Sequence, residues 1–388
     1  MKKVILFWAS RPSPPLELFT RYPQGPPVVF FCKILVVLFL VTGSILGAQP
    51  GNPGQGNIPT GGNGQGNQGN QGNGPSFGGG SITLAPGQNP NSLIPRFART
   101  ANRLSSQREL TLSDLLILRS ILLDRIGYGG REIGLWAEAS GNSTKEANTS
   151  RVTTGSMIAA LDHRFCDHFI LGMAGGYNHT KSDDLSANAG WGGVYGIAFS
   201  GGWYINQTAI GGGDGFTTTR NGFGGVAKAN GAGWFFSEIT QGGYNKTFGN
   251  LTVGPFCLLQ YALSGNPSFS ENGSNAPVTV QGGSNSSLVS DLGFDASYSI
   301  KKVTLKVSAA WEHEYKDTTT FTTVNLVSIP QASTSIAGTS LGHDSAVVSA
   351  GISYQLTERV SVSLGYNGQL GRRNYESNSV TGSIRIGL

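Results

Sequence analysis

The sequence predicts an all-β fold over residues 131–388, a closed antiparallel β-barrel that crosses a membrane. From residue 131 onward, apolar and polar residues alternate with a period of two, the period of a β-strand. The alternating stretches run roughly 10–14 residues, longer than most strands of soluble proteins and suited to a tilted membrane crossing. Charged residues make up 13% of the 388 residues. This is about half the usual share and fits a barrel that exposes apolar side chains.

The alternation assigns side chains to the two faces of the expected barrel wall. It is clearest in residues 303–316, where Leu305 and Val307 share the apolar face and Glu312 and Glu314 share the polar one. Because hydrocarbon excludes charged groups, we expect the polar face to line the lumen and the apolar face to meet lipid. The charged residues expected to face the lumen are Lys306, Glu312, Glu314 and Arg385.

The chain ends on a predicted strand. Val380, Ile384, Ile386 and Leu388 share one face of this strand. In a closed barrel the last strand must pair with the first, since an open edge would leave backbone groups without partners in lipid. We therefore expect these residues to belong to the strand that closes the barrel.

The predicted connections alternate between short turns and long loops, which indicates twelve strands with both ends on the short-turn side. Short turns are expected near 164–168, 200–202, 248–250, 300–302 and 357–359. Longer loops are expected near 142–151, 181–187, 213–226, 265–281, 317–344 and 371–375. Aromatic residues beside the short turns are typical of an interfacial girdle. They are Phe165, Phe169, Phe248, Tyr298 and Tyr354.

The first 48 residues predict an export signal. Within residues 28–48, a basic Lys33 precedes an apolar core and then small residues, with cleavage expected after Ala48. A membrane anchor is the alternative interpretation, and residues 1–27 are either an extended leader or the result of a misassigned start.

Residues 49–104 are predicted to be a low-complexity linker or a vestigial exported segment. Residues 51–80 contain 13 glycines and no charged residue, so this part buries too little apolar area to offset its ordering entropy. A self-associating polar tract is the alternative. The next segment, 105–130, contains the one convincing helix, 107–126. Its leucines recur at helical spacing. The helix either packs against another surface, including a copy of itself, or threads the pore, and the sequence does not separate these cases.

Charge argues against a nucleic-acid partner. The chain carries 27 basic and 22 acidic residues, of which five and one lie in residues 1–48, so 22 and 21 remain beyond the leader. The excess positive charge therefore belongs to the leader and does not form the basic surface that nucleic acids require.

No motif predicts catalysis, a metal or a cofactor. Glu312 and Glu314 are paired carboxylates on one strand, but a lumen charge network with Lys306, Lys316 or Arg385 explains them better than acid–base chemistry. The group of Asp162, His163, Cys166 and His168 has no zinc spacing. The glycine-rich stretch 211–215 is expected to be a loop tip without the helix that a phosphate loop needs. A disulfide between Cys166 and Cys257 is the less favoured alternative to two free thiols.

Four stretches resemble the C-terminal translocator domain of bacterial autotransporters. They are GLWAEASG (134–141), GPFCLLQY (254–261), AAWEHEYKD (309–317) and the last 45 residues, 344–388. The resemblance covers residues 131–388. It implies a twelve-stranded barrel that delivers an N-terminal passenger to the cell surface. Two features depart from the family pattern: Leu388 stands where the family has Phe or Trp, and residues 49–104 stand where the family has a long passenger.

These observations favour an autotransporter-type barrel in the outer membrane that exports or displays its short N-terminal segment. The loops, together with the N-terminal tail if it is exported, would then face the cell surface. The alternatives are a surface antigen, adhesin or small pore without a translocation role, and a barrel enzyme, which no serine or loop carboxylate supports. The expected partners are outer-membrane lipid and the barrel assembly machinery, and the barrel is expected to be monomeric.

Overall fold

The structure is a computed structural model that describes residues 133–388 except 147–150, 167, 223 and 320. The expectations for the signal, the linker and the helix at 107–126 fall outside the described residues. Within that part of the chain, no helix is long and apolar enough to cross a membrane. The strands of the described part are β1 (Ile133–Glu146), β2 (Val152–Cys166), β3 (Phe169–Lys181), β4 (Leu185–Ser200), β5 (Trp203–Gly222), β6 (Gly225–Tyr244), β7 (Lys246–Phe248), β8 (Leu251–Asn266), β9 (Phe269–Ser270), β10 (Val278–Val280), β11 (Gly283–Ile300), β12 (Val303–Glu314), β13 (Phe321–Leu326), β14 (Ile329–Ala337), β15 (Asp344–Gln355), β16 (Val360–Leu370) and β17 (Tyr375–Gly387).

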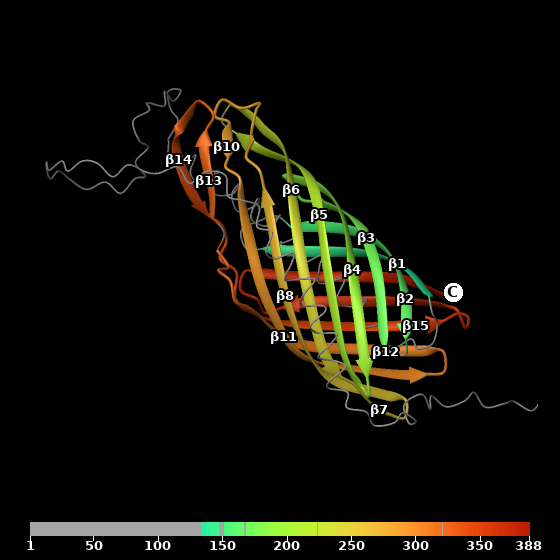
Figure 1. Ribbon diagram of the computed structural model, residues 1–388. Coiled ribbons are helices and arrows are strands. Elements are labelled where there is room, and N and C mark those ends of the chain that lie inside the picture. The colour runs from blue at the N-terminus through green and yellow to red at the C-terminus, as the bar shows by residue number, and fades with distance from the viewer. Residues whose placement is uncertain (1–132, 147–150, 167, 223, 320) are drawn as a thin grey trace, which may run out of the picture. The chain divides into compact units, whose positions relative to one another are not determined.

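Twelve long strands form one closed antiparallel ring (Figure 1). The order around the ring is β1, β2, β3, β4, β5, β6, β8, β11, β12, β15, β16 and β17, and β17 returns to β1. The short β7 pairs with β8 beside the ring. The predicted twelve-stranded closed barrel is therefore confirmed.

The seam between the first and last strands runs along the whole length of both. Its register extends from Gly134 opposite Gly387 to Glu146 opposite Tyr375. Beyond the ladder, the amide N–H of Leu388 donates to the carbonyl of Ile133 at 3.0 Å. The C-terminal strand thus lies where closure requires it, with Val380, Ile384 and Leu388 exposed on the outer surface.

The turns at one end of the barrel are tight. β4 and β5 are joined by Gly201 and Gly202, whose φ angles are +59° and +91°. A two-residue hairpin turn with positive φ at both positions favours glycine, because the strand twist then continues without strain. At the same end, four of the five predicted girdle aromatics are strongly exposed. They are Phe165, Phe248, Tyr298 and Tyr354.

The prediction of a long loop at 213–226 is wrong. β5 and β6 continue through this stretch, and only residues 223–224 separate them. The glycine-rich stretch 211–215 lies inside β5 and pairs with both β4 and β6. Gly212 has a physical reason to lack a side chain, because a Cβ there would overlap Phe235 and the backbone of Gly190. The loop expected at 142–151 is also shorter, since β1 extends to Glu146.

The two longest connections contain a second sheet. β9 and β10 come from the connection expected at 265–281, and β13 and β14 from that at 317–344. They form a four-stranded antiparallel sheet in the order β14, β13, β10, β9. Its apolar residues pack against the loop-end parts of β4, β5 and β6. Figure 1 shows the strands of this sheet beyond that end of the barrel. Ser333, expected in a loop, lies in β14.

We expect the closed ring to make the protein heat-modifiable. Unboiled protein in detergent should migrate faster in gels than boiled protein, because the complete ladder resists detergent. Ala137→Pro should weaken this shift, since Ala137 lies mid-seam opposite Ile384 and proline removes a ladder donor. Glu358→Pro, in the turn between β15 and β16, is the control that should keep the shift. A seam variant as resistant as the parent would contradict closure through β1 and β17.

Candidate functional site: the barrel interior

The interior wall is built by strict alternation along each strand. On β12, Trp311 is 50% exposed on the outer side, whereas the neighbouring Glu312 is 3% exposed on the inner side. Leu305 and Val307 share the outer side with Trp311. The sequence therefore turns every second residue toward the lumen, and the lining can be read strand by strand.

The two glutamates of β12 lie on the inner side and are held by neutral groups. The carboxylate of Glu312 accepts hydrogen bonds from Ser345 Oγ at 2.8 Å and from the amide of Gln369. The carboxylate of Glu314 accepts from Ser287 Oγ and, at 3.0 Å, from the backbone N–H of Leu288. Each carboxylate thus ties β12 to its neighbours. The two do not converge on a common point, as acid–base chemistry would require.

Lys306 and Arg385 lie near one another on the interior side of β12 and β17. Arg385 is close enough to act electrostatically on Lys306 and on Glu138 of β1. Glu138 is buried and was not among the predicted site residues. The alternation of β1 places it on the interior face, so the pattern that identified Glu312 also contains it.

A series of hydrogen-bonded side chains crosses the interior near the short-turn end of the barrel, and it was not predicted from the sequence. The indole N–H of Trp136 donates to Tyr195 Oη at 3.0 Å, and Tyr195 donates to Asp162 Oδ2 at 2.8 Å. The Tyr195 ring lies over Gly172, where a Cβ would overlap it. Three strands, β1, β2 and β4, are thereby joined through side chains. The signal in the sequence was Gly172, which lies on β3 directly opposite Tyr195 of β4.

Small and large residues are paired across the interior elsewhere too. A Cβ at Gly176 would overlap the Trp191 ring, and a Cβ at Gly231 would overlap the Phe216 ring. These glycines lie on strands next to those of their aromatic partners. The aromatic side chains therefore lie flat along the wall in space that glycine leaves open.

Near the loop end, the interior has two contrasting sides. The first, which we call the polar arc, consists of buried hydroxyl and amide residues on β17, β1, β2 and β3. Its members are Asn142, Thr144, Thr154, Ser156, Asn178, Thr180, Ser377, Ser379 and Thr381. The second, which we call the capped arc, is apolar and lies on β4, β5 and β6 beneath the second sheet. Its members are Leu185, Ala187, Phe216 and Ala229.

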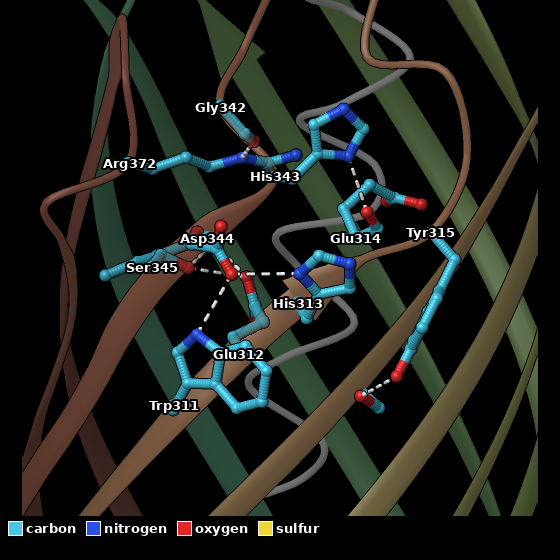
Figure 2. Close-up of polar contacts among 12 residues, drawn as sticks. Trp311, Glu312, His313, Glu314, Tyr315, Gly342, His343, Asp344, Ser345 and Arg372 are labelled. Atoms are coloured by element: carbon cyan, nitrogen blue, oxygen red, sulfur yellow. Dashed lines mark hydrogen bonds and ion pairs between the residues drawn. The ribbon is translucent and has the colours of Figure 1, made fainter.

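A separate polar cluster lies on the outer side of the rim (Figure 2). Asp344 Oδ1 accepts hydrogen bonds from the indole of Trp311 at 3.0 Å and from His313 Nδ1 at 2.9 Å. His343 Nδ1 donates to the carbonyl of Glu314 at 2.6 Å. The hydrogen bond from His313 lowers the pKa of the Asp344 carboxyl, which lies at the loop end of β15 outside the spanning part. The cluster clasps β12 to β15.

At this cluster lie a serine, a histidine and an aspartate, the residue types of a nucleophilic triad. Ser290, His313 and Asp344 are direct cross-strand neighbours on β11, β12 and β15. A triad requires the serine hydroxyl to bond the second imidazole nitrogen. Here Ser290 Oγ instead bonds Tyr315 Oη at 3.0 Å. The observed contacts thus describe a structural clasp.

The cysteine and histidine group near the second turn shows no metal geometry. Among the residues that the structure describes, no set of three or more His, Cys, Asp or Glu side chains is placed to hold a metal ion. Cys166 and Cys257 are free and exposed. Asp162 takes part in the Tyr195 chain instead.

A closed twelve-stranded barrel with a polar-lined interior is an architecture of outer-membrane proteins. Residues 133–367 match the model of the autotransporter beta-domain family, and the chain belongs to this family. The solved translocator domain of the autotransporter NalP from Neisseria meningitidis is similar, with a TM-score of 0.61 and 13% identity. That likeness covers 75% of this chain and 99% of that domain. The barrel is accordingly an outer-membrane domain of the autotransporter type.

Two curated relatives are extracellular serine proteases of Serratia marcescens. One is 26% identical over 280 residues and the other 25% identical over 284 residues. Each match covers 68% of this chain and 26% of the relative. The chain thus spans about a quarter of the length of these relatives.

Tyr195→Phe should destabilise the barrel by about 1–3 kcal/mol, because it removes a donor from the buried Asp162 and an acceptor from Trp136. Tyr177→Phe is the matched control. Its hydroxyl donates to Asn188 at the exposed outer surface, so its loss should cost much less. Denaturant unfolding in lipid vesicles measures both. Equal costs would show that the interior chain contributes nothing special.

Proposed function

We propose that this barrel exports or displays its own N-terminal segment, residues 49–104, at the cell surface. The observation that carries the proposal is the closed ring itself, in a chain of the autotransporter family. β1 begins at the short-turn end, where Ile133 is opposite His163 of β2. The preceding chain therefore arrives at that end and reaches the other side only through the interior.

The proposal divides the chain as follows. Residues 1–48 serve as the export signal, 49–104 form the exported segment, 105–130 form a helix and linker, and 131–388 form the barrel. The helical part at 113–126 would lie inside or just below the lumen. Its many leucines need apolar contacts. The interior offers them in a buried cluster that includes Ile158, Ile197 and Ile210.

The outer surface of the barrel is proposed to contact outer-membrane lipid, with Lys306, Glu312, Glu314 and Arg385 facing the lumen. Exposed apolar side chains such as Val307 and Phe294 support this assignment. Folding would use the barrel assembly machinery, and the barrel would act as a monomer without a catalytic role or nucleic-acid partner.

An adhesin or surface-antigen function is the second candidate. The four-stranded sheet favours it, because a folded unit at the loop end presents a defined surface. A buried ion pair of 2.5 Å between Arg220 of β5 and Glu271, which follows β9, fastens that unit to the barrel. This function would need no translocation.

Arginine substitutions on β12 test the assignment of the two faces. Val307→Arg should cost about 2–4 kcal/mol near the midplane. Leu305→Arg should cost less, because Leu305 lies level with the girdle residue Tyr298. Ser308→Arg, on the inner face, should be mild. Unfolding in vesicles gives the three values. Equal costs at residues 307 and 308 would show that the faces are assigned wrongly.

Surface labelling tests the export of the N-terminal segment. In a background with Cys166→Ser and Cys257→Ser, we expect Ser76→Cys to react with a membrane-impermeant thiol reagent on intact cells. Ser333→Cys in β14 is the positive control for reagent access. Labelling at residue 333 without labelling at residue 76 would rule out export and favour the adhesin or antigen function.

A further inference from the structure

We propose that the polar arc is the track along which the N-terminal segment leaves the barrel. After export, residues 97–112 would rest against this arc. The inference rests on the proposed function, since a track needs a chain that passes. It adds which side of the interior guides that chain.

The register shows that the lining changes abruptly from polar to apolar. Inward-facing residues of consecutive strands form one cross-strand row: Ser379, Asn142, Thr154, Thr180, Ala187 and Phe216. The first four carry hydroxyl or amide groups, and the last two are apolar. The boundary falls between Thr180 and Ala187, at the junction of β3 and β4. A chain passing this level therefore meets two chemically different surfaces.

The capped arc is already covered. Phe216 packs edge-on against Phe269 of β9, with ring centroids 5.2 Å apart. Val278 and Val280 of β10 and Val324 of β13 are buried in the same cluster. A chain passing along this side would have to separate an apolar core, which costs the transfer free energy of each exposed side chain.

The polar arc has the chemistry that an extended chain needs. Each residue of such a chain brings an N–H and a C=O that require partners away from water. Hydroxyls donate and accept, and those of the arc already bond one another, as between Thr154 and Thr180 at 3.1 Å. Thr144 and Ser377 form a second such pair at 3.3 Å. These bonds can be exchanged for bonds to a passing backbone without exposing a charge.

Charge and length identify the part of the chain that stays on the track. A helix at 113–126 covers only about 21 Å of a membrane about 45 Å thick. The residues just before it must then span the loop-end half of the interior. Residues 97–112 contain Arg99, Arg103 and Arg108 against one acidic residue, Glu109, and so carry net positive charge. Glu146 places a buried carboxyl group at the outer end of β1, beside the arc, where it complements this positive charge.

Photo-crosslinking in the intact, membrane-embedded protein tests the track. Tyr375 and Phe216 are a matched pair of inward-facing aromatics near the loop end, 7% and 6% exposed, on the polar and the capped side respectively. Each is replaced in turn by p-benzoylphenylalanine. After irradiation, trypsin cleaves at Arg96 and Arg119 and at the arginines between them, so mass spectrometry locates crosslinks to residues 97–112. The heat-dependent gel shift selects folded protein.

We expect crosslinks to residues 97–112 from position 375 at several times the yield from position 216, which should instead capture β9 or β10. Ser379 and Ala187, from the single row described above, repeat the comparison with smaller residues. Equal yields on the two sides, or a higher yield from the capped side, would overturn the track. Labelling of Ser76→Cys decides export independently, so failure of the track and failure of the proposed function remain distinguishable.

Discussion

The pairing of β17 with β1 is the interaction on which the rest of the structure depends. A sheet surrounded by lipid has no water to satisfy an open edge, so its two ends must find each other. The seam between Gly134 and Glu146 satisfies this requirement over the full length of β1. Once the ring is closed, inside and outside become separate environments. Alternate residues of each strand then face one environment or the other.

Closure also determines where the two long loop-end connections lie. They leave the ring at the same end and have enough length to form secondary structure of their own. The result is a sheet whose strands β10 and β13 come from different connections, with Val280 opposite Val324. This sheet covers one side of the interior and leaves the other side lined by hydroxyl and amide groups. The asymmetry of the interior is thus a consequence of which loops are long.

The strand count and the faces of the strands could be predicted from the sequence because both depend on local periodicity. The stretch 211–215 could not, since five residues with four glycines have no periodicity to detect. It forms part of a strand because β4 and β6 pair with it on either side and because the Phe235 ring occupies the space beside Gly212. The second sheet escaped prediction for a related reason: the β10–β13 pairing at its centre joins residues more than forty positions apart, such as Val278 and Leu326.

For the interior site, too, the sequence predicts the face on which a residue lies but not its partners. Alternation along β12 places Glu312 and Glu314 on the inner face, but their partners depend on the register of three other strands. Gln369 of β16 reaches Glu312 past β15, and nothing in either local sequence indicates this contact. The Trp136–Tyr195–Asp162 chain is more remote still, because it needs the position of β4 relative to β1 and β2.

The glycine–aromatic pairs of the interior constrain how such a sequence can diverge. Gly172 with Tyr195, Gly176 with Trp191 and Gly231 with Phe216 each combine one absent side chain with one large one. A side chain added at the glycine collides with the ring, whereas loss of the ring opens a void in the wall. Neither change is tolerated singly as well as an exchange of both. Substitutions at these positions are therefore coupled in pairs, while the outward-facing glycines Gly190 and Gly215, which have open space around them, vary independently.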